Sequence, residues 1–310
     1  MAFATAHSAA PPYITTRIYC CSSQFRFVTN RAIRHSGIRS ASANNVAGIG
    51  QQKGEIDMGI LQDRVAIVTG ASSGAGYGAA KRFAEEGAIV VATARRKDRL
   101  DALVAEIEVA GGKAIALECD LFKEEDIDKV VNTTIKQFGR IDILANIGQG
   151  SLDKHAYLEG IEVANAVEVY MGGPIQSLLF MQKCFPHMKE RNYGRIINCG
   201  SQSCLSGLPG FGGYEMAKAA VQALTRTASQ EWAKYGITTN VFLPAHWSDA
   251  FKLSAQGIEA GNSAAERSPM GKLGEPYEDV SPMVAFLASE GAGYINGQAI
   301  AIDGGVQLIA

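Results

Sequence analysis

The sequence lacks the patterns that would suggest a metal site, a membrane span or a nucleic-acid partner. Its six cysteines form no CxxC pair and have no histidine cluster near them, so no metal site is expected. The longest apolar runs are only as long as strands, which is too short to cross a bilayer. The net charge is -2, whereas nucleic-acid binding usually requires a basic face. We therefore predict a soluble globular protein with neither a membrane nor a nucleic acid as partner.

The first 57 residues have almost no acids. They hold six of the basic residues but only Glu55 and Asp57 as acids, and they are rich in Ser, Ala and Asn. This composition is typical of an organelle transit peptide, and the apolar segment of a secretory signal is missing. We predict a leader over residues 1–57 and a location in the mitochondrial matrix or the plastid stroma. The alternative is a disordered tail, or upstream sequence before a start at Met58, and a cytoplasmic protein.

After Met58, short β-rich runs alternate with longer helical stretches. Apolar strands separated by helices indicate parallel strands that are covered on both faces. The predicted fold class is therefore α/β: a single Rossmann-type, doubly wound domain over residues 58–310 with a parallel seven-stranded sheet. The seven predicted strands are residues 65–69, 89–93, 114–118, 141–145, 195–199, 238–243 and 299–302.

The first predicted strand ends in a glycine-rich turn, and a helix follows directly. Residues 69–76 read TGASSGAG, which spaces the glycines as G-x-x-x-G-x-G. Glycines let backbone N–H groups approach a pyrophosphate, and a helix N-terminus favours its negative charge. The turn alone would be a weak signal, but strand, turn and helix together predict a dinucleotide site.

This turn and several later motifs resemble those of the short-chain dehydrogenase/reductase family, including its 3-oxoacyl-thioester reductases. The resemblance covers about residues 60–310. The later matches are Asp120, Ala145-Asn146-Ile147-Gly148, Ser201, the Tyr214-x-x-x-Lys218 pair, Gly297-Gln298 and Asp303-Gly304-Gly305. The resemblance implies a nicotinamide cofactor in contact with Gly70, Ser72, Ser73, Gly74, Gly76, Arg95, Arg96, Asp120, Leu121, Asn146, Gly148, Tyr214, Lys218, Pro244 and Trp247.

The end of the second predicted strand bears on the choice of cofactor. An acid there would bind a ribose 2′-hydroxyl and repel a 2′-phosphate, but this chain reads Thr93-Ala94-Arg95-Arg96. Guanidinium groups pair well with phosphate. We therefore predict NADP(H) rather than NAD(H). The alternative is that both arginines simply begin a solvated helix.

Tyr214, Lys218 and Ser201 predict the chemistry. Hydride transfer to a carbonyl leaves an alkoxide that needs a proton, and a free tyrosine, with a pKa of about 10, is a poor relay at neutral pH. Lys218 lies four residues later on the same helix face, where its charge favours the phenolate. We predict that Tyr214 is the general acid/base, that Lys218 lowers its pKa and that Ser201 orients the substrate oxygen. The resemblance also implies that Lys218 binds the nicotinamide ribose.

Two positions depart from the family pattern. The family's usual Asn, which supports a water linked to the Lys, falls on Gly173 or Gly172 here. Pro174 leaves the carbonyl of Tyr170 without its helical partner, so we predict that this carbonyl or a neighbour holds the water instead. The second departure is Ala245, where the family commonly has Gly, and it is tolerated unless the backbone needs a positive φ.

A loop over about residues 246–270 corresponds to the variable substrate loop of the family. Its aromatic and aliphatic residues and few charges predict a mainly apolar small-molecule carbonyl or alcohol as substrate, with packing of a lid as the alternative role of the aromatics. The loop contains Trp247, Phe251 and Leu253. The candidate substrate contacts are Gln149, Ser203, Phe211, His246 and His155.

The family resemblance also implies a homo-oligomer, either a dimer or a tetramer. The helices near residues 122–138 and 174–190 are the predicted contacts between subunits. Leu178, Leu179, Met181 and Phe185 would suit such a face. They could equally pack on their own sheet.

The sequence as a whole predicts an NADP(H)-dependent oxidoreductase that interconverts a carbonyl and an alcohol, such as a ketone reductase. One alternative is a non-redox step, such as epimerisation or dehydration, on the same cofactor-binding fold. The other is a cofactor-binding sensor or interaction protein with weak or no turnover, which the missing Asn motivates.

Overall fold

A computed structural model describes residues 59–248 and 255–307. Seven strands in these ranges form one sheet in the order β3-β2-β1-β4-β5-β6-β7, and every neighbouring pair is parallel. The predicted α/β fold with a doubly wound, seven-stranded parallel sheet is thereby confirmed. The strands are β1 (Val65–Thr69), β2 (Ile89–Ala94), β3 (Lys113–Glu118), β4 (Ile143–Asn146), β5 (Gly194–Cys199), β6 (Ile237–Pro244) and β7 (Ala299–Ile302).

Some predictions fall outside the described residues. The leader predicted over residues 1–57 lies there, and so do Phe251 and Leu253 of the substrate loop. The organelle location therefore stays a prediction. None of the helices in the described ranges combines the length and the apolar character that a membrane crossing requires.

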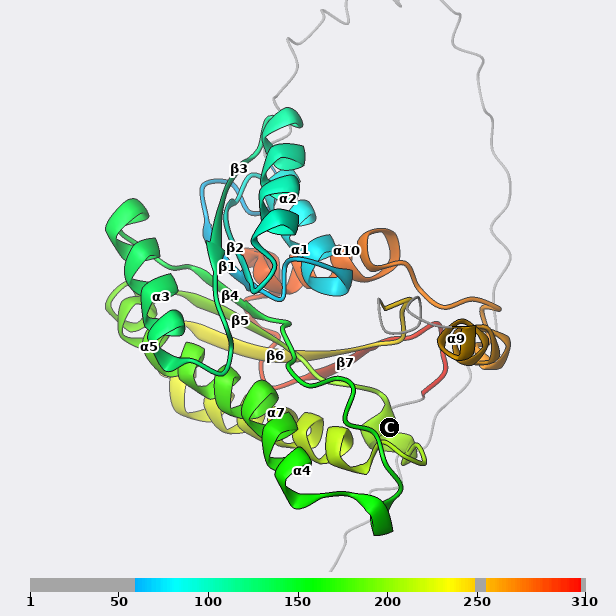
Figure 1. The fold of residues 1–310 in the computed structure, drawn as a ribbon. Coiled ribbons are helices and arrows are strands. Elements are labelled where there is room, and N and C mark those ends of the chain that lie inside the picture. Colours follow the sequence, from blue (N-terminus) through cyan, green and yellow to red (C-terminus); the bar gives the residue numbers. More distant parts are fainter. Residues whose placement is uncertain (1–58, 249–254, 308–310) are drawn as a thin grey trace, which may run out of the picture. The chain divides into compact units, whose positions relative to one another are not determined.

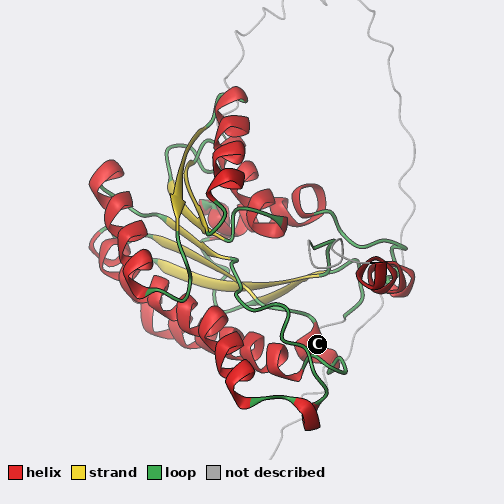
Figure 2. Cartoon of the chain, in the orientation of Figure 1, coloured by secondary structure: helices red, strands yellow, loops and turns green. Residues whose placement is uncertain are grey.

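Helices cover both faces of the sheet (Figure 1, Figure 2). One layer consists of α1 (Gly74–Glu85), α2 (Lys97–Val109) and α10 (Ser281–Ala288). The other consists of α3 (Glu124–Phe138), α5 (Gln176–Glu190) and α7 (Gly212–Trp232), with α4 (Val163–Tyr170) against α7. The remaining elements are η1 (Leu158–Gly160), η2 (Met171–Ile175), α6 (Ser203–Ser206), η3 (Ala233–Tyr235), α9 (Ala255–Arg267), η4 (Pro276–Val280) and η5 (Glu290–Ala292).

Each helical layer closes its own hydrophobic core against the sheet. In β1, Ala66 and Val68 belong to the core under α1, α2 and α10, whereas Ile67 belongs to the core under α3 and α5. This alternation follows from the two-residue period of a strand. Because both faces are covered, β1 and β4 are buried along their whole length, which explains their continuous apolar runs.

The strand order places a crevice at the carboxyl ends of β1 and β4. The chain winds from β1 outward to β3 and then returns to the other side of β1 for β4. Helices leave in opposite directions at such a switch point, which is where doubly wound sheets bind ligands. The glycine-rich turn after β1 lies at this place.

The helix pair predicted to join subunits, α3 and α5, makes contacts within the chain. Lys183 on α5 places its Nζ 2.7 Å from Asp128 Oδ1 and 2.9 Å from Glu124 Oε1, both on α3. Met181 is fully buried, and Phe185 packs against the same core. Met181 and Phe185 thus pack on their own sheet, and a contact of this helix pair with another subunit stays a prediction.

Candidate active site

The glycines of the turn after β1 have distinct structural roles. Gly70 and Gly74 have φ values of +69° and +54°, a left-handed conformation that favours glycine. A Cβ on Gly70 would lie 2.7 Å from the Cα of Gly148, and one on Gly76 would lie 2.3 Å from the carbonyl oxygen of Gly70. A Cβ on Gly74 would lie 3.7 Å from His246 Cε1, an ordinary van der Waals contact, so the positive φ and not crowding favours glycine there.

The N-terminus of α1 is open to an anion. Ser73 is its N-cap residue, but the Ser73 side chain makes no capping hydrogen bond. Arg96 Nη2 instead donates to Ser73 Oγ at 2.8 Å and to Ser72 Oγ at 2.9 Å. Arg96 therefore braces the turn, and the first N–H groups of the helix are not covered by a cap. An uncapped helix start beside a glycine turn fits a pyrophosphate.

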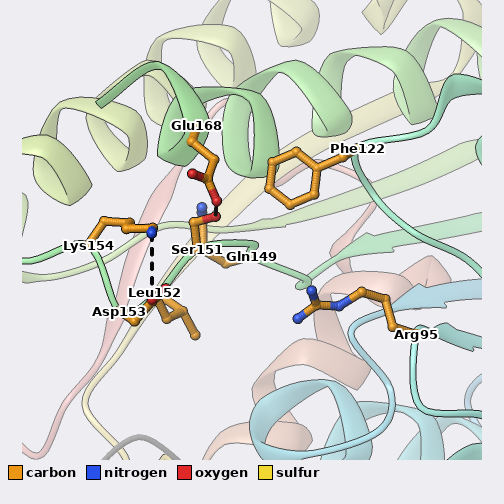
Figure 3. A pocket seen from close by; sticks show the side chains of 8 residues that line it. All are labelled: Arg95, Phe122, Gln149, Ser151, Leu152, Asp153, Lys154 and Glu168. Atoms are coloured by element: carbon orange, nitrogen blue, oxygen red, sulfur yellow. Dashed lines mark hydrogen bonds and ion pairs between the residues drawn. The ribbon is translucent and has the colours of Figure 1, made fainter. Parts of the chain in front are cut away.

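Arg95 points into a hollow of about 350 Å³ at the end of β2 (Figure 3). The far wall comes from the connection after β4, where Ser151 donates a hydrogen bond to Glu168 of α4. Lys154 Nζ and Asp153 Oδ2 lie 3.8 Å apart on the same wall. The lining residues are Arg95, Phe122, Gln149, Ser151, Leu152, Asp153, Lys154 and Glu168.

The three residues predicted to react come together at the carboxyl edge of the sheet. Ser201 follows β5, and its Oγ accepts the N–H of Ser203 at 3.2 Å and lies 2.9 Å from Ser203 Oγ. Lys218 is only 3% exposed, and its Nζ donates to the carbonyl of Cys199 at 2.9 Å. The same Nζ lies 5.7 Å from the centre of the Tyr214 ring.

Burial dominates the electrostatics of Tyr214. It raises the pKa of the phenol above its ordinary value, the nearby Cys199 and Cys204 thiols act in the same direction, and the hydrogen bond with Ser201 lowers the pKa. Burial likewise raises the pKa of Cys204 to about 11. The lowering that we predicted from Lys218 is thus not the net effect. Tyr214 is protonated at neutral pH, which is the state that a proton donor needs.

The segment without the family's Asn is π-helical. In Met171–Ile175 the hydrogen bonds shift by one residue, and Gln176 N–H bonds to Met171 O. In a π-helical register the carbonyl of Tyr170 pairs with the residue five positions later, Ile175, and so does not need the N–H that Pro174 lacks. The prediction that Pro174 leaves the carbonyl of Tyr170 open is therefore wrong.

A glutamine carboxamide fills the place of a side chain at Gly173. A Cβ on Gly173 would lie 2.5 Å from Gln149 Oε1 and 3.0 Å from Nε2. Gln149 Nε2 donates to Gly150 O at 2.9 Å and to Val169 O at 3.1 Å, so the side chain ties the loop after β4 to α4. Gln149 Oε1 is buried without a hydrogen-bond partner in the described part of the chain.

The other predicted site residues lie around the crevice. Asn146 is buried and donates to Asn198 Oδ1 at 3.0 Å. Trp247 packs on α9, because a Cβ on Gly261 would lie 2.3 Å from its ring. Ala245 follows Pro244 at the end of β6, and its φ is not positive, so the alanine is tolerated as expected.

Asp120 and Leu121 follow β3 at the same edge of the sheet. Asp120 Oδ1 accepts the N–H of Phe122 at 3.2 Å. A Cβ on Gly148 would lie 2.8 Å from Leu121 Cδ1, so this side chain packs over the end of β4. The cofactor contacts that we predict for both residues stay predictions.

Sequence reasoning missed two residues that support the site. Thr69 Oγ1 accepts the N–H groups of Ile147 and Gly148, each at 3.0 Å. Gln176 Nε2 donates to the carbonyl of Gly148 at 3.0 Å. A polar residue at the end of an apolar strand was a signal for Thr69, whereas nothing local to Gln176 pointed to this contact.

Known proteins match the chain over most of its length. A family model described as enoyl-(acyl carrier protein) reductase matches residues 70–307. Short-chain reductase protein NovJ of Streptomyces niveus is 32% identical over 256 residues, which are 80% of this chain and 96% of that protein. The 3-oxoacyl-[acyl-carrier-protein] reductase of Thermotoga maritima is 32% identical over 251 residues, 80% of this chain and 99% of its own. The chain belongs to the short-chain dehydrogenase/reductase family.

Membership in the short-chain dehydrogenase/reductase family makes the chain an oxidoreductase of carbonyl and alcohol substrates with a nicotinamide cofactor. A solved structure of 7α-hydroxysteroid dehydrogenase, complexed with NADH and 7-oxo glycochenodeoxycholic acid, superposes with a TM-score of 0.74 at 27% identity. The match covers 79% of this chain and 94% of that one. Because this similar structure holds NADH, family membership does not by itself choose between NAD and NADP.

The contact between Gln149 and Gly173 generates the first prediction. Gly173→Ala forces the carboxamide away from its two hydrogen bonds, which lowers the free energy of unfolding by about 1–2 kcal/mol. In a Gln149→Ala background the same substitution meets no carboxamide. The free energy of unfolding should then be unchanged or slightly higher, because alanine is a better helix former than glycine. Thermal and urea unfolding of the four variants measures this coupling.

Gly160→Ala is the matched control, because a Cβ there meets nothing within 4 Å. Equal costs of Gly173→Ala in both backgrounds would show that Gln149 does not occupy the place of a side chain at 173.

Proposed function

We propose that this chain is an NADP(H)-dependent reductase that converts a carbonyl of a mainly apolar small molecule into an alcohol, and the reverse. The observation that carries the proposal is the meeting of Ser201, Tyr214 and Lys218 at the edge of the sheet where the glycine turn also lies. A hydroxyl, a protonated phenol and a buried ammonium group are what proton transfer to a carbonyl oxygen requires.

The residues of the crevice fit a nicotinamide dinucleotide. The glycine turn and the uncapped start of α1 suit the pyrophosphate. Arg95 at the hollow beside β2 supports the choice of NADP(H), because a guanidinium group pairs with a 2′-phosphate and no acid ends this strand. Arg96 has a different role from the predicted one in this proposal: it stiffens the turn through Ser72 and Ser73.

Tyr214, Ser201 and Lys218 perform the proton chemistry in this proposal. The bound cofactor supplies the hydride. The Tyr214 hydroxyl donates its proton to the carbonyl oxygen, and the Ser201 hydroxyl donates a hydrogen bond that orients the same oxygen. Lys218, anchored on the carbonyl of Cys199, places a positive charge where the phenolate forms. In the reverse direction the phenolate takes the proton of the alcohol.

We also propose that two copies of the chain pair through α4 and α7. The outer side of these helices has an apolar hollow of about 410 Å³. Val163 is 78% exposed and Val167 55%, which is unusual for a cluster of large apolar side chains on a monomer. The lining is wholly apolar and consists of Ile161, Val163, Ala166, Val167, Tyr170, Met171, Ile175 and Met216.

The role of Arg95 is tested by cofactor binding. Arg95→Ala removes a charge-assisted contact to the 2′-phosphate, so the Kd of NADPH rises about 10- to 100-fold while that of NADH changes little. Fluorescence titration with both cofactors measures the difference. Arg226→Ala, which removes an exposed arginine on α7, is the control. Equal losses for NADPH and NADH would contradict the proposed contact.

The raised pKa of Tyr214 predicts the pH dependence. Reduction uses the protonated phenol, so its kcat/KM stays level through neutral pH and falls only as the pH rises through the raised pKa. Oxidation of the alcohol uses the phenolate, so its kcat/KM increases with pH over the same range. Rates in both directions from pH 6 to about 10 measure these profiles.

Tyr214→Phe should lower both rates by about 10²- to 10⁴-fold and abolish their pH dependence. NADPH oxidation by the variant at the rate of the unaltered protein would refute the proposed role of Tyr214.

The pairing of α4 and α7 is tested by Val167→Glu. A charge in an apolar contact is costly, so this variant should be monomeric at micromolar concentration while the unaltered chain is not. Light scattering after size exclusion measures the mass. Val109→Glu, at a position 90% exposed on α2, should leave the assembly unchanged. An unaltered chain that is itself monomeric would overturn the proposal.

A further inference from the structure

Three aromatic rings lie together at the residue proposed to donate the proton. The ring centres of His155 and Phe211 are 4.1 Å apart with an angle of 37° between their planes. Tyr214 stands edge-on to both, with its centre 6.2 Å from Phe211 and 6.5 Å from His155. These separations and angles are those of attractive ring–ring contacts.

Backbone contacts between two distant segments hold the ring cluster of His155, Phe211 and Tyr214 in place. The N–H of Ala156 donates to the carbonyl of Gly210 at 3.1 Å. Leu158 packs on the start of α7, because a Cβ on Gly212 would lie 2.7 Å from its Cδ2. The connection between β4 and α4 therefore runs past the start of α7 (Figure 1). The cluster is part of the fold and not a chance meeting of side chains.

The ring cluster is partly open to solvent. His155 is exposed, and Phe211 and Tyr214 are half-buried. The part of the His155 ring that packs on Phe211 is shielded from water, and this desolvation lowers the pKa of the imidazole below its ordinary value. The hydrogen bond with the backbone of Leu152 and the charge of Asp153 act in the opposite direction. The imidazole is therefore neutral at neutral pH, and it offers a ligand an aromatic surface without a positive charge.

We propose that the substrate is a ketone with an aromatic ring, whose ring packs against His155 and Phe211 while its carbonyl oxygen meets Tyr214 and Ser201. This inference rests on the proposed reductase function and specifies its substrate class. A planar ring can stack on one member of the cluster and meet the edge of another, which a puckered or straight saturated chain cannot do. Each such ring–ring contact improves binding about two- to tenfold beyond area burial.

A matched pair of ketones tests the inference. Phenylacetone and cyclohexylacetone have the same carbon skeleton, and a methylene group separates the ring from the carbonyl in both, so the carbonyls have similar intrinsic reactivity. The full chain should reduce phenylacetone with the higher kcat/KM. Phe211→Leu should lower kcat/KM for phenylacetone about fivefold while that for cyclohexylacetone changes less than about twofold.

Three further variants separate the ring contact from general damage. His155→Leu should reduce the preference for phenylacetone, whereas His155→Phe should keep it. Phe286→Leu, at a partly exposed phenylalanine on α10 in the opposite helical layer, should change neither rate. NADPH binding and thermal unfolding of each variant show whether it is folded. The inference is overturned if the unaltered chain reduces both ketones with the same kcat/KM, or if Phe211→Leu lowers kcat/KM equally for both.

Direct binding distinguishes this inference from the proposed function. Saturation-transfer NMR measures the affinity of each ketone for the protein loaded with NADP⁺, which has no hydride to transfer, so binding is observed without turnover. Preferential binding of phenylacetone that Phe211→Leu removes supports the aromatic site, even if no ketone is reduced and the reductase proposal fails. Reduction of cyclohexylacetone with no preference for phenylacetone in rate or in binding supports the reductase and refutes the aromatic site.

Discussion

The crevice depends on a tie between the carboxyl ends of β1 and β4. Thr69 Oγ1 accepts two N–H groups from the chain just after β4, at Ile147 and Gly148. Directly beyond it, Gly70 approaches Gly148 so closely that a side chain at position 70 would collide with its backbone. These contacts fix the distance between β1 and β4, the two strands at which the direction of winding reverses. The glycine turn, the start of α1 and the loop after β4 are all positioned from this point.

Helix α7 and the end of β5 together position Ser201, Tyr214 and Lys218 at this edge of the sheet. Tyr214 and Lys218 are four residues apart on α7, so one helix face presents both. The ammonium group of Lys218 is buried, and a hydrogen bond to the end of β5 compensates part of its lost hydration. Because Ser201 follows β5 as well, a single strand end orients both the lysine and the serine. Small shifts of β5 against α7 would therefore separate Ser201 from Tyr214 and Lys218.

The sequence was sufficient to predict the strands, their parallel arrangement and the residues of the glycine turn. Continuous apolar runs indicate strands that are buried on both faces. The turn is a local sequence pattern, because a positive φ and close contacts require its glycines. It was not sufficient for Tyr214, whose pKa is set by its burial, or for Gln149, whose carboxamide lies where a side chain at Gly173 would begin. Burial and contacts between distant residues are properties of the assembled chain, and no local spacing encodes them.

Gly173 and Gln149 are best understood as one change and not as two. The absence of the family's Asn was our reason to consider a protein without turnover. A carboxamide nevertheless occupies the place where a side chain at 173 would begin, and two hydrogen bonds hold it there. Glycine at 173 is what admits Gln149, and the π-helical register accommodates Pro174 beside it. The departure thus replaces a polar side chain on the helix by the carboxamide of Gln149 from the loop after β4, which weakens the argument from the missing Asn.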